Sequence, residues 1–183
     1  RTIQTKKDTE VNGRYCMVAS GSITYNNMGQ IIRQGQPVEN TADTAYTPSS
    51  EKNPTLYAYD DMGRVDSIYY PNNTESSFSY SIADNRFTTT ATDQIGKTKI
   101  SVMDIRGKII SVTEGIGITT RYYYNPIGEI TRVLDAQNNP TDITYDLMGR
   151  RTSIDNRDTG RIDYEYDLAG NLLYKTTPNL RAS

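Results

Sequence analysis

Aspartate is the residue type in this sequence whose chemistry and spacing come closest to catalysis. Two carboxylates held close together can act as a general acid and a general base. The candidates for such a pair are Asp60, Asp61, Asp84, Asp104, Asp146 and Asp167. The 183 residues contain no histidine, which excludes Ser-His-Asp, Cys-His and histidine zinc sites. Most of these aspartates also open a turn motif, where bonding to the backbone explains them. We therefore predict no catalytic residue and no enzyme.

The other candidate ligand sites have simpler structural explanations. Cys16 is the only cysteine, so an intramolecular disulfide or a cysteine zinc cluster cannot form. A phosphate loop beginning at Gly115 would need a helix after it, but residues 118–124 have the pattern of a strand. The segment 155–160 places Arg157 where a calcium loop needs a ligand. We expect neither a metal nor a cofactor.

Charge and hydropathy exclude two further classes of partner. Lys and Arg total 20 against 22 Asp and Glu, and the basic residues form no cluster, so nucleic acid is not expected to bind. No apolar run approaches the length of about 18 residues that spans a bilayer. The N-terminus has no signal-peptide pattern, and its start at Arg1 is consistent with a mature fragment.

A six-residue motif organises the chain. It consists of Tyr, then Asp or Asn, two variable residues, Gly and a polar residue, and its copies are YNNMGQ (25–30), YDDMGR (59–64), YNPIGE (124–129), YDLMGR (145–150) and YDLAGN (166–171). A variant at 103–108 begins with Met, and a degenerate copy at 80–86 has Asp84 or Asn85 in the place of Gly. The motif glycines from Gly107 to Gly170 recur every 21 residues, which indicates a tandem repeat.

Turn chemistry explains the motif. A type I turn favours Asp or Asn at its first position and Gly at its fourth, where φ becomes positive. The predicted structural turn residues are Asp60, Gly63, Asp104, Gly107, Asn125, Gly128, Asp146, Gly149, Asp167 and Gly170. A second turn signal precedes the motif glycine by 11 residues, at Gly96, Gly117, Asn138 and near Asn73. Each repeat therefore contains two turns and two strands.

The segments between the turns have the pattern of strands. Tyr164 and Tyr166 flank Glu165, and Ile143 and Tyr145 flank Thr144, so apolar and polar residues alternate. Beyond the motif turn, apolar residues recur at an interval of three, which predicts a bulge there. We expect an all-β fold, an elongated, twisted or spiralling antiparallel strip of ~21-residue β-hairpin repeats. About seven repeats give about fourteen strands, with Tyr and Ile facing inward.

The repeats also predict the domain organisation. Residues 1–22 precede the first motif and are expected to form one or more lead-in strands. Residues 23–183 form the strip. The distance from Gly29 to Gly63 exceeds one repeat, and the polar residues 40–55 between them are predicted to be an insertion loop.

The motif resembles the YD repeats of the Rhs/YD-repeat family, which includes bacterial polymorphic toxins, the shells of insecticidal toxin complexes and the teneurins. The match is closest at Tyr59-Asp60, Tyr145-Asp146 and Tyr166-Asp167 with their following Gly-Arg or Gly-Asn, and it extends from about Ile23 to the C-terminus. The resemblance implies a β-strip that wraps into a hollow shell, a secreted or cell-surface location and, in some members, binding of carbohydrate or partners. The chain departs from the family in having too few repeats to close a large shell and no Asp-Pro autoproteolysis motif.

Two functions fit these observations. The first is a non-enzymatic structural module that scaffolds or encloses a partner within a larger protein. The alternative is a surface that binds carbohydrate or protein through stacking on Tyr59, Tyr124, Tyr145 and Tyr166. Such rings would recur about every 10 Å along the strip, although they equally suit its own packing. The expected partners are the remaining repeats of a parent protein or a second copy of the fragment, which has unpaired ends.

Overall fold

A computed structural model describes residues 4–11, 13–40 and 53–181. They fall into two compact units, of which the first holds the described residues up to Ser79 together with Ala91–Lys97. Its strands are β1 (Lys6–Val11), β2 (Arg14–Ala19), β3 (Ile23–Tyr25), β4 (Ile31–Gln34), β5 (Val38–Asn40), β6 (Thr55–Tyr59), β7 (Val65–Tyr69) and the first part of β8 (Glu75–Ala83).

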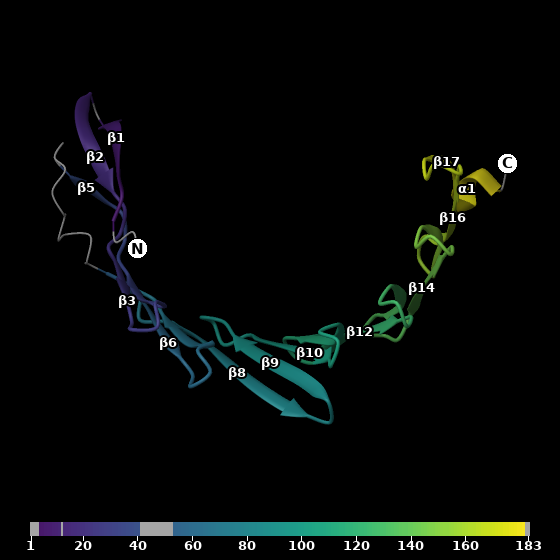
Figure 1. The fold of residues 1–183 in the computed structure, drawn as a ribbon, viewed down its shortest axis with the longest axis horizontal. Helices are drawn as coiled ribbons and strands as arrows, with labels where there is room; N and C mark the ends of the chain where they lie inside the picture. The colour runs from purple at the N-terminus through teal and green to yellow at the C-terminus, as the bar shows by residue number, and fades with distance from the viewer. Residues whose placement is uncertain (1–3, 12, 41–52, 182–183) are drawn as a thin grey trace. The chain divides into compact units, whose positions relative to one another are not determined.

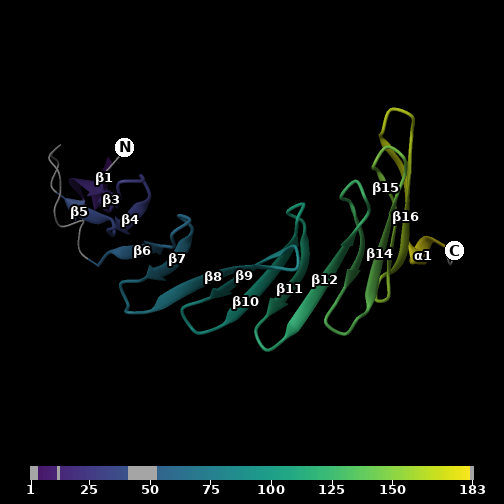
Figure 2. The same cartoon turned by 60° about the horizontal axis from the view of Figure 1, so that its bottom comes forward.

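The second unit holds Tyr80–Thr90 and the residues from Thr98 onward. Its elements are most of β9 (Arg86–Thr92), then β10 (Thr98–Asp104), β11 (Ile109–Glu114), β12 (Ile118–Tyr124), β13 (Ile130–Leu134), β14 (Pro140–Tyr145), β15 (Arg151–Asn156), β16 (Gly160–Tyr166), β17 (Leu172–Thr176) and the short helix α1 (Pro178–Arg181). Within this unit, Figure 2 shows β10, β11 and β12 side by side in chain order, and β14, β15 and β16 likewise. None of the helices in the described residues has the length and apolarity needed to cross a membrane.

The strands pair as antiparallel neighbours. An open 14-stranded sheet runs from β3 to β17 and follows the chain order, except that β5 is absent from it. This topology confirms the predicted all-β strip of sequential hairpins and its number of strands. Because each strand pairs with its neighbour in the sequence, nearly all backbone hydrogen bonds of the strip are local.

The lead-in segment has a partner that its sequence did not reveal. β1 and β2 form a hairpin, and β5 pairs with β2 and completes a three-stranded sheet (Figure 1). β5 includes Asn40, so the predicted insertion loop begins with a strand residue. Strand pairing along this edge uses only backbone N–H and C=O groups, so the residue types of β5 do not reveal its partner. The central residues of that predicted loop, 41–52, lie outside the described residues.

The motif turns share one backbone geometry. At Asp146, the backbone N–H donates to the carbonyl of Arg150 (2.9 Å), and the N–H of Gly149 donates back to the Asp146 carbonyl (3.1 Å). This is a type I turn closed by a residue with positive φ, the commonest three-residue hairpin loop. The register of β14 against β15 shifts between Thr144 and Tyr145, which leaves Thr152 as the extra residue of the predicted bulge.

The degenerate motif copy uses a different turn. Between β8 and β9, both Asp84 and Asn85 have positive φ, 50° and 58°. Two successive residues in this region are typical of a type I′ hairpin, the tight two-residue turn that Asn and Asp tolerate. This repeat therefore keeps its hairpin without a glycine.

The sheet in the second unit presents two different faces. One row across β14, β15 and β16 consists of Ile143, Ile154 and Ile162. We call this side the tyrosine–isoleucine face and define it by Tyr122, Val133, Ile143, Ile154, Ile162 and Tyr164, which are half-buried. The opposite side, the polar face, carries a row of cross-strand neighbours from β12 to β16, namely Tyr123, Arg132, Asp142, Asp155 and Arg161.

Little of the described chain is fully buried. The buried residues are two apolar ones, Cys16 and Ala19, two glycines, Gly21 and Gly35, and four serines, Ser22, Ser67, Ser76 and Ser153. A sheet normally buries one face against a second layer. In the second unit the described strands form a single sheet, and the short helix α1 packs against its strand β16. The side chains of the tyrosine–isoleucine face are half-buried, so part of their surface remains accessible.

Candidate binding surfaces

In four copies of the motif, the tyrosine that opens it is bonded to an earlier hairpin. The Tyr145 hydroxyl donates to the backbone carbonyl of Ile130 at 2.9 Å, 15 residues earlier. The same bond recurs from Tyr124 to Ile109 (2.7 Å), from Tyr166 to Arg151 (2.9 Å) and, in the first unit, from Tyr59 to Ile31 (2.6 Å). In each case the acceptor is the first residue after a motif turn. This hydrogen bond therefore ties one repeat to the preceding one.

Burial and neighbouring tyrosines keep two of these hydroxyls protonated. Burial raises the pKa of Tyr124, and the nearby Tyr122 raises it further. The pKa of Tyr59 is likewise raised by burial and by Tyr57. A hydroxyl that stays protonated remains a hydrogen-bond donor over the physiological pH range.

The faces of two motif rings are covered by cations from the preceding motif. The guanidinium carbon of Arg150 lies 4.9 Å from the ring centroid of Tyr166, and Lys108 Nζ lies 5.8 Å from that of Tyr124. Arg150 also donates through Nη1 to the carbonyl of Asp167 at 2.9 Å. These contacts engage the rings of Tyr124 and Tyr166, two of the predicted stacking residues, in packing within the strip. Ligand stacking by Tyr59, Tyr124, Tyr145 and Tyr166 stays a prediction.

The second and sixth positions of the motif are partners. Asp146 Oδ1 accepts the backbone N–H groups of Met148 and Arg150, and Asp146 Oδ2 accepts Arg150 Nε at 2.6 Å. The same pairing joins Asn26 to Gln30, Asp60 to Arg64, Asn125 to Glu129 and Asp167 to Asn171. Sequence reasoning recognised the turn and missed this pair. The sequence contained a signal for this pair, because the residue types at the second and sixth positions change together from copy to copy.

These bonds hold the motif carboxylates in the ionised form. The backbone N–H and the side chain of Arg150 lower the pKa of Asp146, against a smaller effect of desolvation. At Asp167, the side chain and the backbone N–H of Asn171 lower the pKa. A general acid needs the opposite shift. The aspartates at the second motif position, Asp60, Asp104, Asp146 and Asp167, lie one to a turn, and Asp61 adjoins Asp60 in the same turn.

The remaining sequence candidates occupy turns. Asp61 is exposed at the corner of its turn, and Gly63, Gly107, Gly128, Gly149 and Gly170 have φ between 74° and 93°. In the loop at 156–160, Asn156 Oδ1 accepts the backbone N–H of Asp158 at 2.9 Å. Across the described ranges, no three Asp, Glu, Cys or His residues are grouped so that they could hold a metal.

The turn carboxylates predict acid sensitivity. A carboxyl whose pKa is lower in the folded state stabilises the fold above its unfolded pKa, about 3.9 for Asp. That stability is lost as the pH falls through the depressed folded value. We expect the urea midpoint to be constant from pH 7 to about 5 and to fall steeply below about 4.

A matched variant tests this cause. The substitutions Asp104→Asn, Asp146→Asn and Asp167→Asn keep an oxygen acceptor at the turn, as Asn26 and Asn125 do naturally. Urea titrations between pH 2.5 and 7 should give this triple variant a visibly flatter acid limb. An acid limb identical to that of the wild type would refute the assignment.

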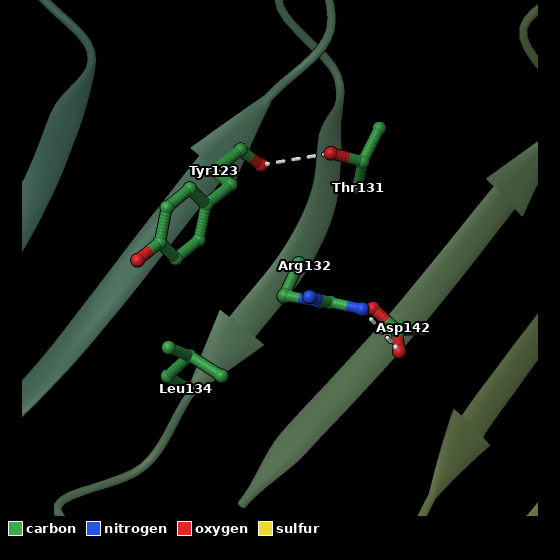
Figure 3. Close-up of a pocket in the computed structure, with 5 residues that line it drawn as sticks. All are labelled: Tyr123, Thr131, Arg132, Leu134 and Asp142. Carbon is green, nitrogen blue, oxygen red and sulfur yellow. Dashed lines mark hydrogen bonds and ion pairs between the residues drawn. The ribbon is translucent and has the colours of Figure 1, made fainter. Parts of the chain in front are cut away.

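A shallow hollow of about 450 Å³ lies on the polar face (Figure 3). Its lining residues are Tyr123, Thr131, Arg132, Leu134 and Asp142. Arg132 makes a bidentate ion pair with Asp142 on the adjacent strand, with Nη2 to Oδ2 at 3.0 Å. The bond to Asp142 raises the pKa of Arg132, so the pair stays charged.

The Tyr123 ring is available to a ligand. Its residue is 46% exposed, and it faces the opposite side of the sheet from Tyr122. An accessible aromatic ring beside fixed donors and acceptors suits a polyhydroxylated ligand. Side chains alternate between the two faces of a sheet along a strand. This alternation is the signal in the sequence that places Tyr123 on the opposite face from Tyr122 and Tyr124.

These features define the class of the protein: an open sheet of sequential antiparallel β-hairpin repeats, four of which are tied to an earlier hairpin by a motif tyrosine. No protein-family model and no curated protein sequence matches the chain. Solved structures do match. The Photorhabdus luminescens Tc holotoxin pore superimposes with a TM-score of 0.75 at 19% identity, covering 96% of this chain and 11% of that one.

The crystal structure of TcdB2-TccC3 gives a TM-score of 0.72 at 19% identity, covering 95% of this chain and 10% of that chain. The chain thus spans about a tenth of the length of the structures that it matches. It has the fold of a segment of the TcdB2-TccC3 shell, which is built of Rhs/YD repeats, and the predicted resemblance is confirmed at the level of the fold.

Proposed function

We propose that this chain is a non-enzymatic structural module of a larger, secreted or surface-exposed YD-repeat protein, and that its sheet supports or encloses a partner. The observation that carries the proposal is the tyrosine hydrogen bond that links successive repeats, at Tyr124, Tyr145 and Tyr166. Through this bond the motif joins the repeats to one another. The similarity to a component of a bacterial toxin complex supports the secreted setting.

The tyrosine–isoleucine face is the side that we assign to the partner. Its row of Ile143, Ile154 and Ile162 crosses three strands, and the opposite face at the same place carries Asp155 and Arg161. Contiguous accessible apolar surface is characteristic of interaction sites. A polypeptide with exposed apolar side chains, such as an unfolded chain, has the complementary chemistry.

A second candidate function rests on the hollow at Tyr123. A sugar ring could stack on this tyrosine while its hydroxyl groups bond to Arg132 and Asp142. We therefore assign carbohydrate binding to this hollow and not to the motif tyrosines. The hydroxyls of four motif tyrosines donate to backbone carbonyls, and cations cover two of their rings.

Two tyrosine variants, one on each face, separate these functions. The probes are a reduced and carboxymethylated polypeptide, which cannot fold, and maltoheptaose, each titrated by calorimetry. We expect the polypeptide to bind the wild type, and Tyr164→Ser to weaken that binding about tenfold. Tyr123→Ser, which changes the same residue type on the polar face, should leave it unchanged.

Each other outcome has a definite meaning. Binding of maltoheptaose that Tyr123→Ser abolishes and Tyr164→Ser retains would establish the second candidate. Failure of the polypeptide to bind, or equal losses in both variants, would refute the role of the tyrosine–isoleucine face. Circular dichroism of each variant checks that the strip is folded.

A further inference from the structure

Each complete motif turn carries a large apolar side chain at its exposed corner. In the second unit these are Ile105, Ile127, Leu147 and Leu168, whose exposed fractions range from 78% to 107%. In the first unit the corners carry Met28 and Met62, 74% and 76% exposed, which stand at the fourth motif position like Ile127, whereas the other three corner residues of the second unit stand at the third. Turn corners favour small and polar residues, and the turn hydrogen bonds use no side chain from these positions. The turn itself therefore does not account for these apolar residues.

The four corners of the second unit lie along one edge of its sheet. Successive antiparallel hairpins turn alternately at the two edges, so the β10–β11, β12–β13, β14–β15 and β16–β17 turns share an edge. We call it the motif edge and define it by Ile105, Ile127, Leu147 and Leu168. The opposite edge carries Ile116 in one turn, but Gln137 and Asp158 in the next two. The apolar character is thus concentrated on the motif edge.

In two of the four turns of the motif edge the carboxylate forms an ion pair inside the turn, and in the other two it is bonded to a neutral amide. Asp104 pairs with Arg106 at 2.8 Å, Asp146 pairs with Arg150 at 2.6 Å, and Asp167 is bonded to the Asn171 amide at 2.8 Å. Bringing a second surface against an unpaired charge would be costly. Internal ion pairs lower that cost at the turns of Asp104 and Asp146.

The spacing of the corners identifies the occupant. Successive corners are separated by two strands, or about 10 Å. A partner must present apolar groups at the same interval, and another stretch of this repeat does so by construction. We infer that the motif edge docks against the motif edge of a second copy of this chain. The inference does not depend on the proposed function, which rests on the tyrosine–isoleucine face.

Sedimentation velocity from about 1 to 500 µM tests the inference, in the range where interfaces with few apolar anchors dissociate. The wild type should dimerise. The double variant Ile105→Ser/Ile127→Ser should weaken the dimer at least about tenfold, because interface energy is concentrated in few side chains. The matched control is Ile95→Ser/Ile116→Ser, two isoleucines of half-repeat turns that are 82% and 102% exposed. It should leave the dissociation constant unchanged.

Three results would overturn the inference. They are a monomeric wild type at the highest concentration, equal weakening by both double variants, and association that is lost only in Leu173→Pro. The last result would mean pairing through the end strand β17, which a proline blocks. Because all four isoleucines are exposed, circular dichroism should show unchanged folding. The double variant Ile105→Ser/Ile127→Ser should still bind the polypeptide, and Tyr164→Ser should still dimerise. These two results keep this test separate from that of the proposed function.

Discussion

Replacing Gly21 with alanine is expected to destabilise the first unit by about 3 kcal/mol, near the upper end of overpacking effects. A Cβ at Gly21 would lie 1.5 Å from the carbonyl oxygen of Gly35 and 2.1 Å from its carbonyl carbon. Both are backbone atoms, so no change of rotamer relieves the clash. The Gly35 N–H also donates to the Ser22 carbonyl at 2.8 Å, which holds the two segments together.

The location explains why the effect should be large. Gly21 connects β2 to β3, and Gly35 connects β4 to β5, so the two glycines cross where the chain leaves the three-stranded sheet and later returns to it. Both glycines are buried. Separating the backbones at this crossing would disturb the pairing of β5 with β2, and not only one side chain.

Urea unfolding followed by circular dichroism measures the loss, and hydrogen exchange in β2 and β5 locates it. The control is Gly13→Ala. Gly13 has φ of 71° and no atom within 4 Å of an added Cβ, so this change costs only left-handed strain, about 1 kcal/mol. A Gly21→Ala variant no less stable than Gly13→Ala would show that the crossing accommodates a side chain.

The strip could be predicted because its determinants are local and repeated. Asp146 and Gly149 specify their turn within four residues, and the 21-residue period applies the same signal at Asn125 and Gly128. The interval between Ile130 and Val133 even indicated the bulge. A pattern that recurs in every hairpin allows each copy to support the assignment of the others.

The features that escaped prediction are non-local or occur once. The partner of β5 is β2, about twenty residues away, and no repeat of that contact exists in the described chain to reveal it. The acceptor of Tyr145 is a backbone carbonyl, which every residue possesses, so no residue type marks it. The hollow beside Tyr123 depends on which strands become neighbours, and this follows only from the complete sheet.

Loss of the three motif hydroxyls in the second unit is expected to destabilise the protein about as much as the glycine change. In the variant Tyr124→Phe/Tyr145→Phe/Tyr166→Phe, the rings remain and the bonds to Ile109, Ile130 and Arg151 are lost. A typical intramolecular hydrogen bond contributes about 1 kcal/mol net. The tyrosines lie about 10 Å apart in successive repeats and share no acceptor, so their effects should add to about 3 kcal/mol.

The control variant also removes three hydroxyl groups, from two tyrosines of β12 and one of β16. The hydroxyls of Tyr122, Tyr123 and Tyr164 make no hydrogen bond to other residues in the described part of the chain. The triple Phe variant at these positions should therefore unfold within about 0.5 kcal/mol of the wild type. Urea unfolding at pH 7 compares the two variants, and equal losses would mean that the motif bonds do not stabilise the strip.

The same experiment tests whether these bonds hold the repeats together as a cooperative unit. In a repeat protein each unit contacts only its neighbours, and cooperativity depends on the energy of the contacts between units. The motif hydroxyls act between hairpins, so their loss should lower this coupling more than the stability of any single hairpin. The unfolding transition of the motif variant should then broaden, with a smaller m-value, while that of the control keeps the slope of the wild type. A lower midpoint with an unchanged slope would instead assign each tyrosine bond to the stability of its own hairpin.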